Sequence, residues 1–277
     1  VPGDPGYGFA CASWNVIWNH EPALVVQAAD ETDVVEAVRY AADHSLAVVV
    51  QATGHGVVTP ADRASLLLQI SALDQVQVDP VARTATIGGG ATWDPVLSEA
   101  SAVGLAPLVG SSPYTGAVGY TLGGGFGWLG RKHGLAVDSV RSLRVVLADG
   151  KVVTTTPQHE PDLFWALCGA GGGSLGVVVE MTVALANVSD VYAGSLFYPL
   201  EAAREVFDRY RSWSASAPTE LTSAFNITSF PPLEIVPEPL RGKSFVIVRG
   251  CHCGDLDHAA SLVDQWRDWQ APLIDAW

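Results

Sequence analysis

The sequence predicts an α+β fold in two parts, residues 1–188 and residues 189–277. Three observations predict it. Short strands and amphipathic helices alternate along the chain, three segments rich in glycine and other small residues interrupt them before residue 188, and none does so afterwards. Such a change of composition is typical of a domain boundary. We therefore expect a glycine-rich first domain and a second domain with a mixed sheet.

The elements follow from local patterns. Residues 32–44 are expected to form a helix because apolar residues such as Val34 and Val38 recur at helical spacing. Asp149-Gly150 is a two-residue hairpin signal, which implies antiparallel strands around it. The other expected strands are residues 25–27, 47–50, 66–70, 76–78, 84–87, 141–147, 151–153, 176–185, 192–197, 222–227 and 244–248. The other expected helices are residues 93–102, 162–168, 201–213 and 256–269, and the tryptophans on the last two favour a core role.

Length and composition bound the class of protein. A chain of 277 residues with 48% hydrophobic residues can bury a substantial core. A formal net charge of −14 opposes binding to nucleic-acid phosphates or anionic lipid. We expect a soluble protein, because no apolar run reaches the roughly 18 residues of a membrane helix and no signal peptide is evident. The start at Val1 and the single methionine, Met181, favour a trimmed N-terminus.

Four scattered cysteines are too few for a disulfide scaffold, although they leave one disulfide bond and the compartment open. Cys251-His252-Cys253 resembles half of a metal site. No second pair of ligands at a usual spacing accompanies it, so a strand end or a redox pair is favoured and no metal is predicted.

The glycine-rich segments call for a reason, because glycine costs about 0.5–1 kcal/mol relative to alanine inside regular elements. A turn explains any one of them. Three together favour close approach of the backbone to a ligand, and converging amide groups would let an acidic protein hold phosphate oxygens. Gly171, Gly173 and Gly176 match G-x-G-x-x-G, but a Rossmann loop follows a strand and opens a helix, whereas this segment follows a helix and opens a strand. No P-loop motif occurs.

His55 lies between two glycines directly after an expected strand, where its neighbours offer no apolar packing. One interpretation is a histidine that hydrogen-bonds the loop backbone. The other is a neutral imidazole that is bonded to the 8α-methyl carbon of a flavin, which anchors the flavin and raises its potential.

Several blocks in a fixed order resemble the flavin domain of the vanillyl-alcohol-oxidase superfamily, in the branch of the berberine-bridge-enzyme-like and 6-hydroxynicotine-oxidase-like proteins. They span about residues 6–185. The blocks are Trp14-Asn15, residues 22–25, residues 32–34, Gly54-His55, residues 87–91, residues 123–127, residues 131–138, residues 162–167 and residues 169–176. The resemblance implies a two-lobed FAD-binding domain of the PCMH type, with part of a substrate domain after residue 188.

The resemblance also implies a cofactor site. His55 would carry FAD through an 8α-histidyl link, Gly176 and Val178 would lie against the adenine half, and Tyr120 would lie near the ribityl chain or be a packing residue. The other residues implied to contact FAD are Gln51, Ala52, Thr53, Gly54, Gly56, Gly110, Ser111, Ser112, Thr115, Gly116, Gly119 and Gly124.

Two departures from the family are informative. The common loop Arg-x-Gly-Gly-His reads Gln51-Ala52-Thr53-Gly54-His55 here, so one cationic contact with the cofactor is lost. Doubly linked members of the family have a cysteine where this chain has Ser112, and a serine cannot form the thioether to the flavin. The resemblance therefore implies a single link, through His55.

The activity that the resemblance implies is an FAD-dependent oxidase that removes a hydride from a C–H bond next to oxygen or nitrogen in a small molecule and reduces O₂ to H₂O₂. A flavin dehydrogenase, an oxidative cyclase and an inactive flavin-binding module remain alternatives. Relatives continue beyond the equivalent of Trp277, and that part often carries the catalytic base. We therefore assign no catalytic residue, and expect either a fragment or a second chain that completes the fold.

Overall fold

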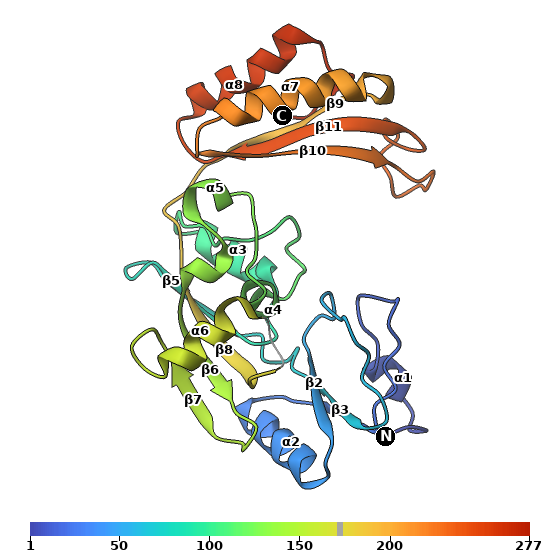
Figure 1. Cartoon of the computed structure of the whole chain (residues 1–277), viewed down its shortest axis with the longest axis vertical. Helices are drawn as coiled ribbons and strands as arrows, with labels where there is room; N and C mark the ends of the chain where they lie inside the picture. Colours follow the sequence, from blue (N-terminus) through green and yellow to red (C-terminus); the bar gives the residue numbers. More distant parts are fainter. Residues whose placement is uncertain (171–173) are drawn as a thin grey trace. The chain divides into compact units, whose positions relative to one another are not determined.

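The structure, a computed structural model, describes residues 1–170 and 174–277 (Figure 1). The predicted α+β class is confirmed. The chain forms two compact units, the first made of Val1–Gly127 and Leu135–Asn187 and the second of Trp128–Gly134 and Val188–Trp277. Residues 128–134 thus group with the second unit, although the sequence analysis placed them in the first part. Each unit is described by itself.

The first unit contains two sheets. Its helices are α1 (Tyr7–Ala10), α2 (Glu31–Asp43), α3 (Trp93–Ser101), α4 (Ala117–Leu122) and α6 (Pro161–Ala170), with a 3-10 turn η1 (Ala136–Ser139). Its strands are β1 (Leu24–Gln27), β2 (Ala47–Gln51), β3 (Ser65–Gln69), β4 (Val76–Asp79), β5 (Thr84–Gly88), β6 (Val140–Val146), β7 (Val152–Thr155) and β8 (Val177–Ala184). Strands β1, β3 and β2 form a parallel sheet in that order, and β4, β5, β8, β6 and β7 form an antiparallel sheet.

Helix α2 shows how the sequence sets these elements. The Asp30 carboxylate accepts a hydrogen bond from the Asp33 backbone N–H at 3.1 Å, which caps the helix start. Val34, Val38 and Ala41 are buried on one face, and they pack with residues of β3 in a common core. Strand β2 pairs with β3, so the packing of α2 on β3 also holds the end of β2 from which the next loop begins.

The structure differs from the sequence analysis in two details. The loop at Asp149-Gly150 has three residues, because Leu147 and Lys151 are still bonded through Leu147 N–H and Lys151 O at 2.8 Å. Gly150 takes the left-handed conformation (φ +75°) that such a loop requires at its last position. The antiparallel pairing of β6 with β7 is confirmed.

The second difference concerns residues 110–127, a glycine-rich segment to which the sequence analysis assigned no helix. They contain helix α4, because Ala117, Val118, Thr121 and Leu122 are buried on one side of it. Burial of this face outweighs the poor helix propensity of the glycines around it.

The second unit is a single antiparallel sheet with α7 and α8 on one face and the short α5 beside β10 on the other (Figure 1). Its elements are α5 (Gly130–His133), β9 (Tyr192–Pro199), η2 (Leu200–Ala202), α7 (Ala203–Ser216), β10 (Leu221–Ser229), β11 (Ser244–His252), α8 (Leu256–Trp269) and β12 (Ile274–Asp275), with strand order β10, β11, β9, β12. Val246 and Val248 of β11 form a core with Val206 of α7 and Trp266 of α8. Residues between them along the strand, such as Ile247, face the other side.

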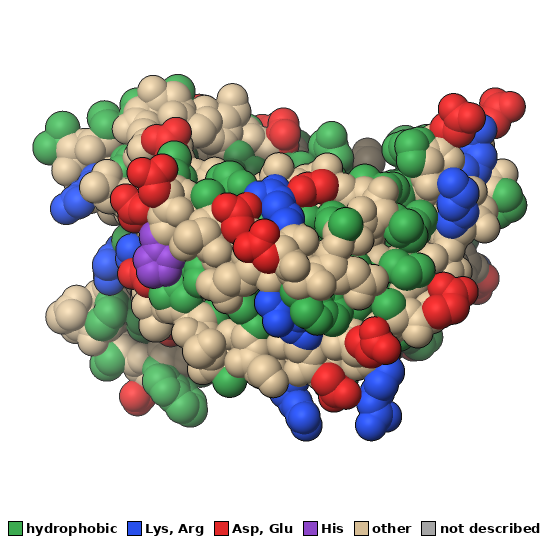
Figure 2. All heavy atoms as spheres, turned by 90° about the horizontal axis from the view of Figure 1, so that it is seen from above, with side chains coloured by type: hydrophobic (Ala, Val, Ile, Leu, Met, Phe, Trp, Pro, Cys, Tyr) green, Lys and Arg blue, Asp and Glu red, His purple; other side chains and the backbone are tan. Residues whose placement is uncertain are grey.

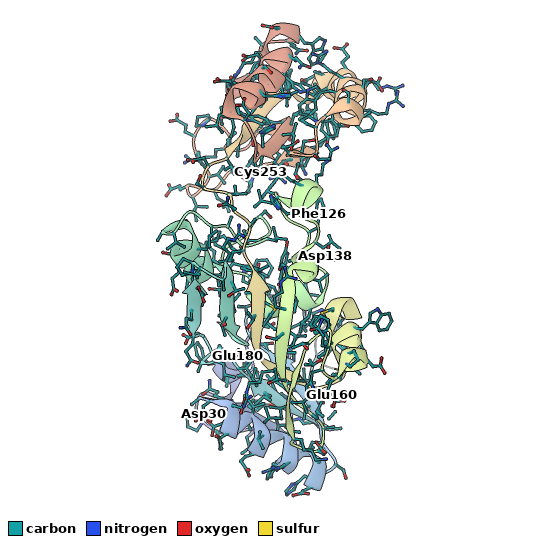
Figure 3. All side chains as sticks on the ribbon, turned by 90° about the vertical axis from the view of Figure 1, so that its left-hand side faces the viewer. Asp30, Phe126, Asp138, Glu160, Glu180 and Cys253 are labelled. Atoms are coloured by element: carbon teal, nitrogen blue, oxygen red, sulfur yellow. The ribbon has the colours of Figure 1, made fainter. Side chains whose placement is uncertain are left out.

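Acidic and basic side chains are interspersed on the face shown in Figure 2, without a continuous basic stripe there. Within the described ranges no helix is long and apolar enough to cross a membrane. All four cysteines are free thiols, and Cys253 follows the end of β11 (Figure 3).

Candidate functional site

The loop after β2 is held by the N-terminal segment of the chain. The Trp14 N–H donates to Thr53 O and the Asn15 N–H donates to Gly54 O, both at 3.2 Å. Gly54 is buried and left-handed (φ +76°), and a Cβ there would lie 2.6 Å from the Ser13 Cβ. Glycine at position 54 is therefore required by packing and by backbone conformation.

Gln51, at the end of β2, connects the start of the loop of residues 52–56 to the N-terminal segment. Its side chain is buried, and its Nε2 donates to Ala12 O at 2.8 Å. Its Oε1 is also buried but has no hydrogen-bond partner among the described residues. A buried acceptor without a donor costs free energy, so this oxygen is suited to a ligand that brings an N–H or O–H group.

His55 is positioned on two sides. Its Nδ1 lies 2.8 Å from the Thr53 Oγ1, and its ring stacks on Trp14 with centroids 4.2 Å apart and planes inclined by 14°. Desolvation lowers the pKa of His55, which favours the neutral imidazole. Nε2 makes no hydrogen bond with the described residues. Sequence reasoning quoted Trp14 only as part of the resemblance and missed its contact with His55, because no local pattern connects two residues so far apart in the chain.

The glycine-rich segment of residues 110–127 contacts the loop of residues 52–56. A Cβ at Gly116, the residue before α4, would lie 3.5 Å from Thr53 Oγ1 and 3.7 Å from the Ala52 Cβ. The Thr115 carbonyl accepts from Trp93 N–H at 3.2 Å, which ties the segment to the start of α3. The structure thus brings together two of the groups of residues that the sequence analysis assigned to one site.

Not every glycine has the same role. A Cβ would meet no atom within 4 Å at Gly56 or Gly119, and only the Leu135 Cδ1 at 4.0 Å at Gly124. Packing within the chain therefore does not require a bare backbone at Gly56 or Gly119. By contrast, a Cβ at Gly90 would lie 1.9 Å from Ile70 O, so that glycine is needed for the fold itself.

Tyr120 of α4 is packed between glycines. A Cβ at Gly110 would approach its ring to 3.1 Å and one at Gly125 to 2.6 Å, and the ring meets Trp93 edge-on at 5.9 Å. Its hydroxyl is buried without a partner among the described residues, and burial raises the pKa of Tyr120 to about 12. Tyr120 is therefore a packing residue whose hydroxyl has no hydrogen-bond partner among the described residues.

The remaining predicted residues are placed as follows. Ser111 is exposed, whereas Ser112 and Thr115 are half-buried. Gly176 (φ +145°) packs on Val146 O, where a Cβ would approach to 2.7 Å, and the Val178 side chain lies in the core. Only the backbone of Val178 can therefore face a ligand. Gly171 and Gly173 lie outside the described residues.

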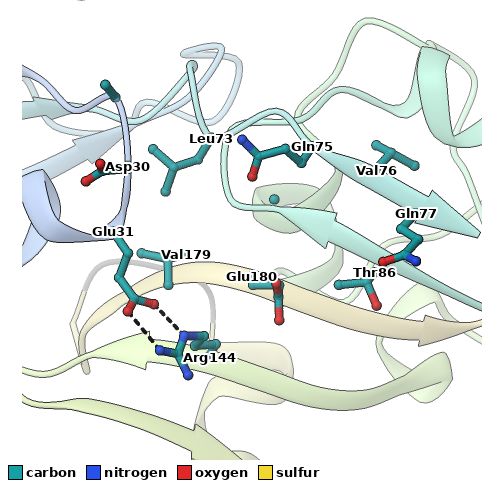
Figure 4. Close-up of a pocket in the computed structure, with 12 residues that line it drawn as sticks. Asp30, Glu31, Leu73, Gln75, Val76, Gln77, Thr86, Arg144, Val179 and Glu180 are labelled. Atoms are coloured by element: carbon teal, nitrogen blue, oxygen red, sulfur yellow. Dashed lines mark hydrogen bonds and ion pairs between the residues drawn. The ribbon is translucent and has the colours of Figure 1, made fainter.

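A separate hollow of about 520 Å³ lies elsewhere in the first unit, between the start of α2 and strands β4, β5 and β8 (Figure 4). The Arg144 Nη2 donates to Glu31 Oε1 at 2.8 Å, so its positive charge is already paired. Asp30 and Glu180, labelled in Figures 3 and 4, add two more carboxylates. This acidic lining disfavours a pyrophosphate, and none of the predicted cofactor residues lies there.

Among the residues that the structure describes, no group of three or more His, Cys, Asp or Glu side chains could hold a metal ion. Burial raises the pKa of Cys251 to about 11 and also raises that of Cys253, so both thiols are held in the protonated form.

Comparisons with known proteins show which family the chain resembles. Residues 22–156 match a family described as an FAD binding domain. The chain is 30% identical over 287 residues to (R)-6-hydroxynicotine oxidase of Paenarthrobacter nicotinovorans, covering 99% of this chain and 59% of that enzyme. It is 34% identical over 217 residues to an FAD-linked oxidoreductase of Dictyostelium discoideum, covering 78% of this chain and 48% of the relative.

Solved structures support the same assignment. The crystal structure of 6-hydroxy-D-nicotine oxidase from Arthrobacter nicotinovorans superimposes with a TM-score of 0.87 at 27% identity, covering 99% of this chain and 59% of that one. Berberine bridge enzyme from Eschscholzia californica shares the fold, with a TM-score of 0.74 over 87% of this chain and 48% of that one at 22% identity. The fold is thus that of an FAD-binding domain. The chain belongs to the family of FAD-linked oxidoreductases that includes 6-hydroxynicotine oxidase and the berberine-bridge-enzyme-like proteins.

The chain spans about half the length of the curated relatives it matches, 48% and 59% for the two named above. The activity and the substrate of a whole protein are therefore matters for proposal.

Proposed function

We propose that this chain forms the flavin-binding part of an oxidase that takes a hydride from a C–H bond next to oxygen or nitrogen in a small molecule and passes the electrons to O₂. FAD would supply the hydride acceptor at its N5 atom. The chain's own task is then to hold and orient the cofactor and the substrate. The observation that carries the proposal is His55, an imidazole whose pKa is lowered by desolvation and which Thr53 and Trp14 hold beside two small-residue loops.

The residues present fit FAD. Gln51 Oε1 and the Tyr120 hydroxyl are buried polar groups without partners among the described residues, and a ligand with several hydrogen-bonding groups would satisfy them. Gly56 and Gly119 leave space where a side chain would otherwise stand. Backbone amides of residues 52–56 and 110–116 would contact the pyrophosphate, which needs no cationic side chain.

We further propose a single covalent link between His55 and the 8α carbon of FAD. Thr53 Oγ1 can accept the Nδ1–H of His55, and in that tautomer the lone pair of Nε2 is free to form the bond. One C–H bond of the 8α methyl group would be broken, one proton would leave that carbon and one the imidazole, and two electrons would pass through the flavin to O₂. Stacking on Trp14 restricts the rotation of the ring. A serine hydroxyl is a weak nucleophile unless a base takes its proton, and Ser112 makes no side-chain hydrogen bond to a base among the described residues, so it would contribute no second link.

The proposed link has a predicted pH dependence. Covalent attachment requires neutral His55, and desolvation lowers the pKa of this residue. The neutral form therefore persists to lower pH than in a free histidine, whose pKa is about 6.5. When FAD is added to the flavin-free protein, the rate of attachment should be constant above neutral pH and fall on acidification, with a midpoint below that value. An attachment rate that rises as the pH falls would contradict the neutral imidazole.

A substitution at Gly119 distinguishes a role in contacting the cofactor from a role in packing. In Gly119→Ala the added methyl meets no protein atom, so the free energy of unfolding should stay the same or rise by up to about 1 kcal/mol, since alanine favours a helix. We expect the affinity for FAD to fall, measured by flavin fluorescence in a His55→Ala background where binding is reversible. The matched control is Gly8→Ala, also a helical glycine with no atom within 4 Å. If Gly119→Ala and Gly8→Ala bind FAD equally well, Gly119 does not approach the cofactor.

The electron acceptor distinguishes the alternatives. In an oxidase, the reduced flavin is reoxidised faster by O₂ than by artificial dyes, and O₂ is consumed. In a dehydrogenase the dyes reoxidise the flavin faster. An oxidative cyclase forms a new ring in its product. The departure at Gln51 also keeps open a flavin-binding module without activity. Such a module would show the yellow flavin bands but no turnover with any acceptor.

A further inference from the structure

Arg249 lies on the face of the second unit's sheet opposite α7 and α8, the face on which the short helix α5 contacts β10. It is in β11, opposite Ala224 of β10 and Ser195 of β9. Its neighbour Val248 is packed in the core under α7 and α8, so Arg249 projects to the other face. Asn226 of β10 pairs with Ile247, two residues before Arg249, and Phe225 beside it is packed on the helix side. Arg249 and Asn226 are therefore diagonal neighbours on one face, at roughly 7–8 Å between their backbones.

Both side chains have unsatisfied polar atoms. The Nε of Arg249 and the Oδ1 of Asn226 are buried and have no hydrogen-bond partner among the described residues. Arg249 forms no ion pair with any carboxylate in those residues, although the chain has 29 Asp and Glu against 15 Lys and Arg. Arg131 and Arg267 of this unit are bonded: Arg131 donates to Leu221 O at 3.2 Å, and Arg267 to Asp275 Oδ2 at 2.7 Å. Arg209 also has a buried Nε without a partner among the described residues, but its Nη2 donates to Gln265 O.

The surroundings of Arg249 are aromatic and apolar. Its guanidinium carbon lies 5.5 Å from the ring centre of Trp128. Farther along the same face, Phe245 and Ile247 form a cluster with Phe230. A cation–π contact with Trp128 stabilises the positive charge through the flat face of the guanidinium, but it leaves the N–H groups at the edge without acceptors. Packing alone therefore does not account for this arginine.

We propose that Arg249 is the anion-binding residue of a ligand site on this face, which holds a small aromatic molecule by a carboxylate group. The carboxylate accepts hydrogen bonds from the Arg249 guanidinium and neutralises its charge. Asn226 supplies a second hydrogen bond, since a flip of its amide presents either the oxygen or the nitrogen. Only the further step, that this ligand is the substrate, rests on the proposed oxidase function.

The test uses benzoate as the probe and benzamide as its uncharged counterpart, in calorimetric titrations of the full chain. The wild type should bind benzoate at least about 10-fold more tightly than benzamide, as expected for a charge-assisted hydrogen bond. Arg249→Gln should abolish this preference and Asn226→Ala should weaken benzoate binding. Arg249→Lys keeps the positive charge but loses the two parallel N–H donors of the guanidinium, and it should retain part of the preference for benzoate. Arg211→Gln on α7 is the control with the same change of charge, at an exposed arginine that forms an ion pair with Asp208.

Three results would overturn the proposal. One is a wild type that does not prefer benzoate, and this comparison needs no variant. The second is an Arg211→Gln variant that loses the preference for benzoate as completely as Arg249→Gln does. The third is an Arg249→Gln variant that is folded by circular dichroism and still binds benzoate as tightly as the wild type. A flavin spectrum recorded on the same samples separates the two proposals. Benzoate preference without flavin would contradict only the proposed function, and flavin without benzoate preference would contradict only this site.

Discussion

In His55→Ala, we expect the flavin to be released completely when the protein is precipitated with acid, whereas the wild type should keep it in the pellet. The variant lacks the imidazole that Thr53 and Trp14 hold in place, so no bond to the cofactor can form. FAD should still bind reversibly, because the loops at residues 52–56 and 110–116 are unchanged. Turnover should fall, since a flavin without the covalent link has a lower potential.

Ser112→Ala is the matched control for this change. Ser112 is half-buried in the neighbouring segment and is the position where a second link would form in doubly linked relatives. This variant should keep its flavin after acid precipitation, as the wild type does. Flavin that stays in the pellet of His55→Ala would show that another residue carries it.

The second large effect is expected at Gly90. In Gly90→Ala the new Cβ would lie 1.9 Å from Ile70 O and 2.7 Å from the Ser71 Cα, both backbone atoms that cannot move alone. We expect the free energy of unfolding to fall by about 3 kcal/mol or more, at the upper end of overpacking changes. Urea unfolding of the flavin-free protein measures it.

Gly8→Ala is the control for folding, because a Cβ at Gly8 has open space around it. Its free energy of unfolding should equal that of the wild type or exceed it slightly. Equal stability of Gly90→Ala and Gly8→Ala would contradict the close approach of the backbones at residues 70 and 90.

Much of the fold could be predicted from the sequence, because hydrophobic periodicity is a local signal. Helix α2 was predicted from apolar residues such as Val34 and Val38, and the structure buries them. Helix α4 was missed because it is short and bordered by Gly116 and Gly123, and only tertiary burial of its apolar side stabilises it. The hairpin at Asp149-Gly150 was predicted with the right pairing but with one residue too few in its loop, since a single glycine is compatible with both lengths.

The candidate site was predictable only in part. The glycines could be noted, but the sequence does not show that Gly54 and Gly90 serve packing while Gly56 and Gly119 face open space. That difference depends on residues distant in the chain, such as Ser13 beside Gly54. The unsatisfied atoms of Arg249 and Asn226 were likewise not predictable, because an orphaned hydrogen-bonding group is defined by what surrounds it.

The mass of the denatured wild-type chain, followed by mapping of the flavin-containing peptide, tests the central claim most directly. The account predicts a mass equal to the polypeptide plus one FAD less two hydrogen atoms, with the addition on the peptide that contains His55. The mass of the polypeptide alone, or an addition on a peptide with Ser112 or Cys168 in place of His55, would contradict it.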